Sequence, residues 1–218
     1  MKVGTDGVLL GAWAAGGKHI LDIGTGTGVV ALMMAQRFPD ALIEGIDIDA
    51  DACSEALENA RSSSFAKRIK IKRCALQDIS AEEWTGNHFD AIVSNPPFFL
   101  NSLKNPDTKR SLARHADSLP FSILCKTARR LLCPNGTLSV IVPAEALQSI
   151  VDEAYLAGFH TKERLAIKTV ERKAPKRYML KFSSDSSSAY KEETVILSNS
   201  DGSRSEWYQN LTKDFYIK

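Results

Sequence analysis

Three glycines at alternate positions are the first residues in this sequence that indicate a ligand-binding site. Residues 20–28 read Ile-Leu-Asp-Ile-Gly-Thr-Gly-Thr-Gly, so the glycines directly follow an apolar run. Glycine allows a sharp turn and close approach of a ligand to the backbone, because it has no Cβ atom. A dinucleotide-binding turn would place its third glycine at position 29, where this chain has Val29. Asp22, just before the turn, suits a cationic amino group and would repel a pyrophosphate.

This glycine turn therefore predicts a site for S-adenosylmethionine, whose methionine part carries such an amino group. The alternative is a tight turn of an α/β protein without a ligand, in which Asp22 only caps the turn. The residues of this segment that we assign to the cofactor are Asp22, Gly24, Thr25, Gly26 and Gly28.

A second carboxylate, Asp47, ends the next apolar run. It lies about 20 residues after the glycines, the offset at which a carboxylate reaches ribose hydroxyls in this kind of crevice. Asp49 and Asp51 are better explained as caps of a helix that begins near Asp51, because negative charge is stabilised at a helix N-terminus. Asp47 is thus the ribose candidate, with Ile48 beside it.

Residues 74–78 follow the third predicted strand and should border the adenine ring. The backbone of Leu76 could bond a ring nitrogen, and the Asp78 carboxylate could accept from the exocyclic amine. Asp78 is equally well explained as a cap for a helix at residues 80–84, so its role stays open.

The strongest chemical signal is the run Asn95, Pro96, Pro97, Phe98 directly after the apolar segment 89–94. The prolines fix the backbone at the edge of the sheet where ligands bind. A planar nitrogen is a poor nucleophile, so a site that methylates it must align it and favour its rehybridisation. The Asn95 side-chain oxygen and the Pro96 carbonyl could each accept one N–H, and Phe98 could stack on a base. This run predicts methylation of a planar nitrogen.

The elements that would position these residues alternate between short apolar runs and longer amphipathic ones. We expect strands at 19–23, 42–47, 69–74, 89–94, 137–142, 165–170 and 178–183, and a further short strand at 194–198. We expect helices at 8–15, 29–38, 51–62, 118–132, 144–157 and 206–215. The predicted fold is α/β, a three-layer Rossmann-like class I methyltransferase fold. Its seven-stranded, mainly parallel sheet ends in a C-terminal antiparallel hairpin.

Composition bounds the remaining possibilities. A net charge of +2 gives no global reason for a polyanionic partner, so RNA binding would have to come from local basic segments. The cysteines form no CxxC pair, which predicts reduced thiols and no metal site. No apolar run is long enough to cross a membrane, and no signal sequence follows Met1, so we expect a cytoplasmic protein.

Taken together, the glycine turn, Asp47 and residues 95–98 resemble the class I methyltransferases with an Asn-Pro-Pro-Phe motif. Residues 1–11 are similar to the N-terminal segment of the bacterial tRNA(Val) adenine-N6 methyltransferases, and the resemblance extends over nearly the whole chain. The length of 218 residues predicts a single domain, and a monomer is the simplest expectation. The resemblance divides this domain into an N-terminal segment (1–17) over the cofactor, a core (18–183) and a C-terminal extension (184–218). It further implies that the residues near the methionine part and the target include Lys2, Gly4, Thr5, Asp6 and Gly7.

The resemblance also implies the substrate, which is the adenosine 3′ of the anticodon in a valine tRNA, flipped out of its loop. One departure is that the acidic residue of many relatives after the third strand aligns with Ala75 here. Two basic segments are the candidate RNA contacts, the long loop at 100–119 and the hairpin turn at 164–177. Their cations are Lys104, Lys109, Arg110, Arg114, Arg172, Lys173, Lys176 and Arg177.

Other functions share parts of this pattern. A protein glutamine-N5 methyltransferase would use the same Asn95 geometry, but such relatives carry tyrosine in place of Phe98. A guanine-N2 RNA methyltransferase uses phenylalanine there, and only residues 1–11 argue against it. An NAD-dependent oxidoreductase would share the sheet and the ribose carboxylate but not the glycine spacing. An RNA-binding module without catalysis is the remaining alternative.

Overall fold

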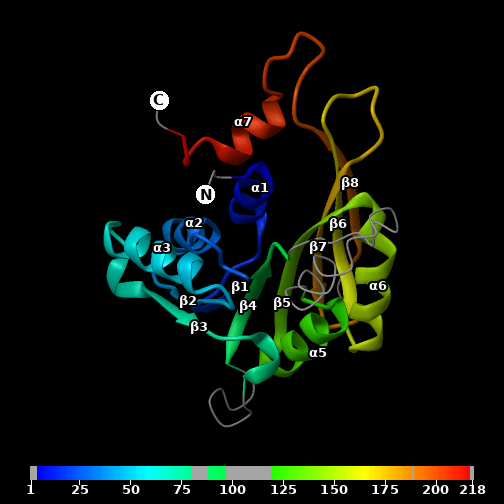
Figure 1. The fold of residues 1–218 in the computed structure, drawn as a ribbon. Coiled ribbons are helices and arrows are strands. Elements are labelled where there is room, and N and C mark those ends of the chain that lie inside the picture. The colour runs from blue at the N-terminus through cyan, green and yellow to red at the C-terminus, as the bar shows by residue number, and fades with distance from the viewer. Residues whose placement is uncertain (1–3, 80–87, 97–118, 188, 217–218) are drawn as a thin grey trace, which may run out of the picture.

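The computed structural model describes residues 4–79, 88–96, 119–187 and 189–216 of the 218-residue chain. The strands are β1 (His19–Ile23), β2 (Leu42–Asp47), β3 (Ile69–Arg73), β4 (Phe89–Ser94), β5 (Leu132–Pro143), β6 (His160–Lys168), β7 (Arg177–Ser183) and β8 (Lys191–Ile196). Within the described residues they form one eight-stranded sheet in the order β3-β2-β1-β4-β5-β7-β6-β8 (Figure 1). The five strands from β3 to β5 are parallel, and β7 is antiparallel to both neighbours, whereas β8 is parallel to β6.

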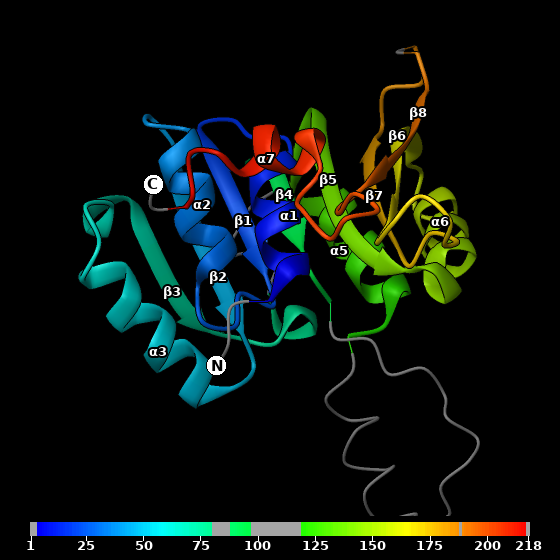
Figure 2. The same cartoon turned by 90° about the horizontal axis from the view of Figure 1, so that it is seen from above.

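Helices cover both faces of this sheet, so it is the middle of three layers. One face carries α1 (Thr5–Trp13), α2 (Val29–Arg37), α3 (Ala50–Arg61) and α7 (Glu206–Thr212), and the other carries α5 (Phe121–Leu131) and α6 (Leu147–Leu156). Short 3-10 turns occupy Ala66–Arg68, Leu76–Asp78 and Ala144–Ala146. Figure 2 shows α2 and α3 beside the β3 to β1 half of the sheet, and α5 and α6 beside the β5 to β6 half. Each face has its own buried apolar core.

The predicted fold class is confirmed, including the antiparallel hairpin of β6 and β7. The short strand expected near 194–198 forms at Lys191–Ile196 and joins the sheet edge as an eighth strand. The helix expected at 8–15 begins earlier, at Thr5, with Gly4 as its N-cap. The strand expected at 165–170 begins earlier too, at His160, because β7 and β8 pair with its polar first half.

Close packing fixes α1 against α2. A Cβ atom on Gly11 would lie 2.8 Å from the Met33 Sδ, so only glycine lets the two helices approach this closely. The Arg37 guanidinium also donates to the carbonyls of Gly11 and Ala14, both at 2.9 Å. These contacts hold the C-terminal half of α1 against the second half of α2.

The carboxyl ends of the parallel strands meet at one edge of the sheet, where α/β proteins bind ligands. Asp22, Asp47 and Ser94 lie at or near the ends of β1, β2 and β4. Because β7 is antiparallel to β5, its first residue, Arg177, is at this edge as well, opposite Pro143. The fold therefore gathers both the predicted cofactor residues and one predicted RNA contact along one rim.

Candidate active site

The glycine turn has the backbone that its sequence requires. Gly24, Gly26 and Gly28 have φ angles of 72°, 55° and 82°, in the left-handed region that side chains disfavour. Both Gly24 and Thr25 donate their N–H groups to the Ile46 carbonyl at 2.9 Å, which ties the turn to the end of β2. A Cβ atom at Gly24 or Gly26 would meet no atom within 4 Å. The turn therefore faces open space, which a bound ligand could fill.

Asp22 lies under this turn and is 1% exposed. Its Oδ2 accepts a hydrogen bond from the Thr25 hydroxyl at 2.7 Å and one from the Ala31 N–H at 3.1 Å. Burial raises the pKa of Asp22 to about 7, although the bonds from Thr25 and Ala31 lower it, and the Asp47 charge raises it further. An incoming cation would stabilise the carboxylate in this dry setting.

Asp47 braces the same turn from the end of β2. Its Oδ2 accepts from the Gly26 N–H at 2.8 Å, and its Oδ1 accepts from the Asp49 N–H at 3.0 Å. Asp49 is the N-cap of α3 and accepts from the N–H groups of Asp51 and Ala52, as expected for a cap. The ribose role predicted for Asp47 stays a prediction, and its carboxylate lies at the carboxyl edge of the sheet beside the glycine turn.

Around the expected adenine site the residues differ in exposure. Ile48 is 43% exposed, which leaves an apolar surface at the rim. Leu76 is buried, while Asp78 is exposed and its N–H donates to the Ala75 carbonyl in a 3-10 turn. Residues 80–87 lie outside the described residues, so the alternative of Asp78 as a helix cap stays open.

Asn95 and Pro96 directly follow β4 at the carboxyl edge. The preceding residue, Ser94, is fully buried, and its hydroxyl donates to the Ile23 carbonyl at 2.9 Å. This bond ties the end of β4 to the end of β1, next to the glycine turn. Ser94 was not among the residues predicted from the sequence, although a small hydroxyl residue directly before the motif was a signal for it. Pro97 and Phe98 lie outside the described residues.

The N-terminal segment reaches the same rim through the first turn of α1. Gly4 caps the helix, Thr5 begins it, and Gly7 faces Val30, whose side chain would lie 3.8 Å from a Cβ there. Asp6 forms an ion pair with Arg177, with 2.8 Å between Oδ2 and Nε. The structure thus joins an expected cofactor residue to an expected RNA residue. Lys2 lies outside the described residues.

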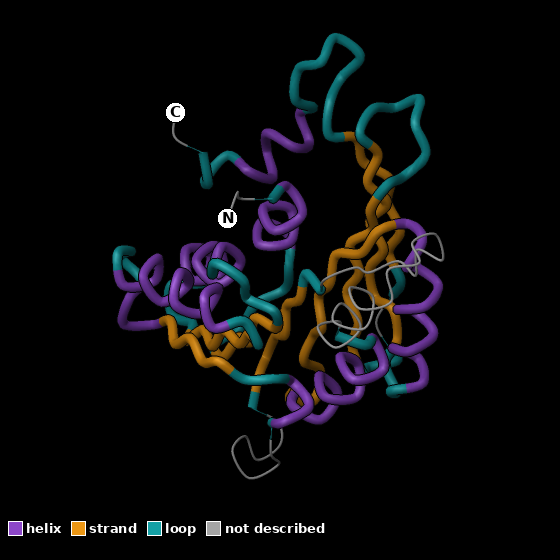
Figure 3. Tube along the Cα trace, in the orientation of Figure 1, coloured by secondary structure: helices purple, strands orange, loops and turns teal. Residues whose placement is uncertain are grey.

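The predicted RNA contacts divide into two groups. Arg172, Lys173 and Lys176 are exposed on the turn between β6 and β7, and no ion pair holds them among the residues described. In the tube of Figure 3 this turn and the loop after β8 lie side by side, and the Ser198 N–H donates to the Thr169 carbonyl at 3.0 Å. The contacts expected in the long loop, Lys104, Lys109, Arg110 and Arg114, lie outside the described residues.

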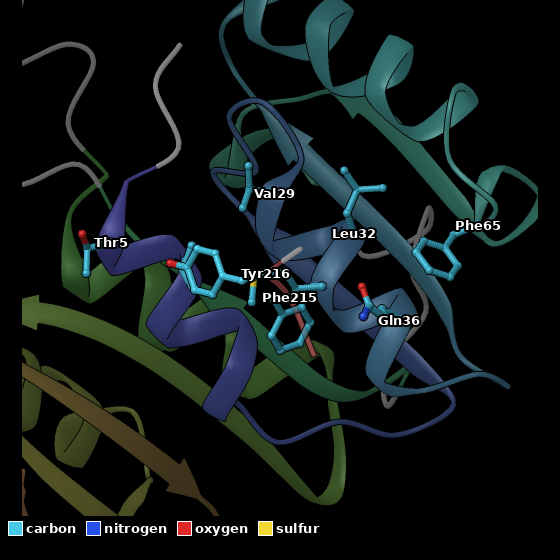
Figure 4. A pocket seen from close by; sticks show the side chains of 9 residues that line it. Thr5, Val29, Leu32, Gln36, Phe65, Phe215 and Tyr216 are labelled. Atoms are coloured by element: carbon cyan, nitrogen blue, oxygen red, sulfur yellow. The ribbon is translucent and has the colours of Figure 1, made fainter. Parts of the chain in front are cut away.

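A separate apolar groove of about 460 Å³ lies between α1, α2 and the C-terminal segment (Figure 4). The α2 residues that line it are Val29, Leu32, Met33 and Gln36, whereas Val30, Ala31, Met34 and Ala35 form the face packed into the core. Phe65 and Phe215 add aromatic walls. The groove therefore opens on the face of α2 that is turned away from the core, and Val29 at its edge directly follows Gly28 of the glycine turn.

Metal-binding clusters and membrane-spanning helices are both absent from the described residues. No group of three or more His, Cys, Asp or Glu side chains could hold a metal ion there. Nor does that part of the chain contain a helix with the length and apolarity to cross a membrane.

Comparison with known proteins adds sequence relatives over the whole chain. Residues 4–154 match the family model of the Methyltransferase small domain. A tRNA1(Val) (adenine(37)-N6)-methyltransferase from Phocaeicola vulgatus is 47% identical over 221 residues, covering 100% of this chain and 91% of the relative. One of the same name from Parabacteroides distasonis is 42% identical, with 100% and 92% covered. Among solved structures, one described as a predicted O-methyltransferase from Agrobacterium tumefaciens has a TM-score of 0.77 at 17% identity, with 98% of each chain covered. That likeness concerns the fold alone.

Proposed function

The chain belongs to the Methyltransferase small domain family, and within it to the tRNA1(Val) (adenine(37)-N6)-methyltransferases, and from this we propose that it methylates N6 of an adenosine in tRNA. The observation that carries the proposal is the position of Asn95 and Pro96. They follow β4 at the carboxyl edge, and the Ser94 to Ile23 hydrogen bond fixes this edge beside the glycine turn. The proposed target is the adenosine 3′ of the anticodon, as the names of the relatives indicate. A tRNA substrate implies a cytoplasmic enzyme.

The residues around the glycine turn fit S-adenosylmethionine as the methyl donor. Open space above Gly24 and Gly26 leaves room for the ligand, and the buried Asp22 is suited to its amino group. Asp47 is suited to the ribose hydroxyls, and the exposed Ile48 offers an apolar surface to the adenine. When bound, the cofactor supplies an electrophilic methyl group on its sulfonium sulfur.

The protein's own residues would then orient the target nitrogen. The Asn95 side-chain oxygen and the Pro96 carbonyl can each accept one N–H of an exocyclic amine, which favours the rehybridisation that nucleophilic attack requires. No strong base is needed, because the nitrogen becomes acidic once it has gained the methyl group. Phe98 is proposed to stack on the adenine, at roughly 1–3 kcal/mol. Catalysis would rest on alignment of the nitrogen.

Methyl transfer to total bacterial tRNA, followed by mass spectrometry of the nucleosides, tests this function. We expect N6-methyladenosine in tRNA from a strain that lacks the modification. N2-methylguanosine, or methyl incorporation into protein alone, would contradict the adenine assignment. Equilibrium dialysis with labelled S-adenosylmethionine and with NAD tests the cofactor separately, and preferential binding of NAD would contradict it.

A further inference from the structure

We propose that Arg177 binds a phosphate of the RNA backbone next to the target nucleotide, and that Asp6 positions its guanidinium for this contact. The proposal rests on the proposed function and assigns part of its substrate site. It starts from the Asp6 to Arg177 ion pair, which links residues 171 positions apart in the sequence. This pair joins the first turn of α1 to the first residue of β7.

The position of Arg177 relative to the catalytic motif supports a substrate contact. Only β5 separates β4 from β7, so the two backbones lie about 10 Å apart, or two strand spacings. In the register, Ser94 pairs with Val140 and Arg177 pairs with Pro143. Arg177 therefore stands about 10 Å further out along the strand direction than Ser94, and about 7 Å further out than Asn95, at about 3.3 Å for each residue. One nucleotide could bridge that interval, with its base at Asn95 and its phosphate at Arg177.

The base of the hairpin is rigid at this point. The Lys176 carbonyl accepts from the Ala144 N–H at 3.1 Å and from the Arg177 Nη1 at 3.0 Å, and the Lys176 N–H donates to the Ile167 carbonyl at 2.9 Å. Asp6 holds Nε from the other side. Because the guanidinium is already fixed in the free protein, little further side-chain entropy is lost when it binds a ligand.

The guanidinium still has capacity for a ligand. Nε and Nη1 are engaged, but among the described residues nothing accepts from Nη2, and the Arg177 side chain is 37% exposed. The exposed cations Arg172, Lys173 and Lys176 continue outward from it along the turn. Such a series suits a polyanion, and guanidinium groups bind phosphate with good geometry. The cofactor's carboxylate is the weaker candidate, because the glycine turn on β1 is one strand further away than Asn95.

The test compares Arg177→Ala with the matched control Arg61→Ala, which removes an exposed cation at the end of α3. Loss of one charged phosphate contact should raise the KM for tRNA roughly ten-fold to a hundred-fold. It should also reduce the salt dependence of log K for binding the tRNA anticodon arm by about 0.7 to 0.9. The Kd for S-adenosylmethionine should stay unchanged, and Arg61→Ala should resemble the wild type. Asp6→Asn should raise the KM for tRNA by a smaller factor.

A double variant separates phosphate binding from a structural role. Asp6→Asn with Arg177→Gln can keep a hydrogen bond between α1 and β7 but removes the cation. If Arg177 binds phosphate, this variant shows the high KM and the reduced salt dependence of Arg177→Ala, whereas wild-type values would overturn the proposal. An unchanged KM in Arg177→Ala, or a matching rise in the Kd for S-adenosylmethionine, would also overturn it while the wild type still methylates tRNA. A wild type that neither binds nor methylates tRNA would overturn the proposed function as well.

Discussion

At the scale of single residues, Asn95 separates binding of the cofactor from transfer of the methyl group. It follows β4, whereas the proposed cofactor residues of the turn follow β1. Asn95→Ala should reduce kcat by roughly a hundred-fold or more, because alignment of the nitrogen is lost. Isothermal titration of S-adenosylmethionine should give an affinity close to that of the wild type. A large loss of this affinity would contradict the role given to Asn95.

Asp22 should make cofactor binding dependent on pH. Its pKa in the folded protein is about 7, so the carboxylate that suits an amino group forms only as the pH rises toward that value. We expect the Kd for S-adenosylmethionine to fall between about pH 5.5 and about pH 7, by at most ten-fold for each pH unit. Titrations at several pH values measure this, and a flat Kd over that interval would count against an ionised Asp22 as the ligand.

The same shift predicts how Asp22 affects stability without the cofactor. The pKa of Asp22 is about 7 in the folded chain and 3.8 ordinarily, so the folded state binds the proton more tightly. This contribution to the free energy of unfolding is complete below pH 3.8 and is lost as the pH rises through about 7. Asp22→Asn should remove that decline, since an amide oxygen can still accept from Thr25 and Ala31.

Urea denaturation at about pH 5 and about pH 8 measures how the free energy of unfolding changes with pH in Asp22→Asn and in the wild type. The variant should lose less free energy of unfolding over this interval, and it should bind S-adenosylmethionine poorly at both pH values. An equal change of the free energy of unfolding with pH in the two proteins would mean that protonation of Asp22 does not cause the decline.

At the scale of elements, the glycine turn can be tested against a loop with the same backbone. Gly26 and Gly202 have φ angles of 55° and 86°, and a Cβ at either would meet no atom within 4 Å. Alanine at each position should cost similar stability, about 1–2 kcal/mol. Only Gly26→Ala should weaken binding of S-adenosylmethionine, by roughly ten-fold or more, because its Cβ would enter the ligand space. Equal cofactor affinity in both variants would show that the turn does not approach the ligand.

The sequence predicted the elements best where both faces of a strand are buried. β1, β2 and β4 have the expected bounds, and β1 and β4 are almost wholly buried, as is typical of central parallel strands. The first half of β6 and the start of β8 could not be found in this way, because both are polar. β6 begins with residues 160–164, and β8 begins with Lys191, Glu192 and Glu193. Their pairing is supported across the strands by the ion pairs of Arg164 with Glu192 and of Lys191 with Glu163.

In the candidate site, too, residues with a local sequence pattern were predicted, and contacts that depend on strand pairing were not. Local spacing indicated Asp22 and the glycines, because Asp22 accepts a hydrogen bond from Thr25 of the same turn. Asp47 was indicated by its offset from the glycines, and it accepts from the Gly26 N–H on the adjacent segment. The Asp6 to Arg177 pair could not be derived from spacing, since it depends on β7 running antiparallel to β5. Ser94 was missed for a similar reason, because its partner is the carbonyl of Ile23 on the adjacent strand.

At the scale of the whole molecule, the N-terminal and C-terminal segments close on each other over the sheet. α7 packs on α1 (Figure 1), and Leu211 and Phe215 contact the small cluster of Val8, Ala12 and Met33. Tyr208 is buried in the same core as Leu9 and Ile20. The extension therefore belongs to the apolar core of this face, which favours a single cooperative unit over a core with an independent appendage.

Tryptophan fluorescence and far-UV circular dichroism can test this cooperativity. Trp13 is in α1 and Trp207 is in α7, so the fluorescence of a Trp84→Phe variant comes only from these two terminal helices, which pack on the core of one face. Circular dichroism reports on the helices of both faces. We expect one transition with the same midpoint by both probes. S-adenosylmethionine should shift both midpoints together, because at a ligand concentration of about 100 Kd it raises the free energy of unfolding by about 2.7 kcal/mol. An earlier fluorescence transition would mean that α1 and α7 separate from a core that is still folded. In that case the proposed cover of the cofactor on α1 would open independently of the sheet, and Asp6 would move away from Arg177 on β7.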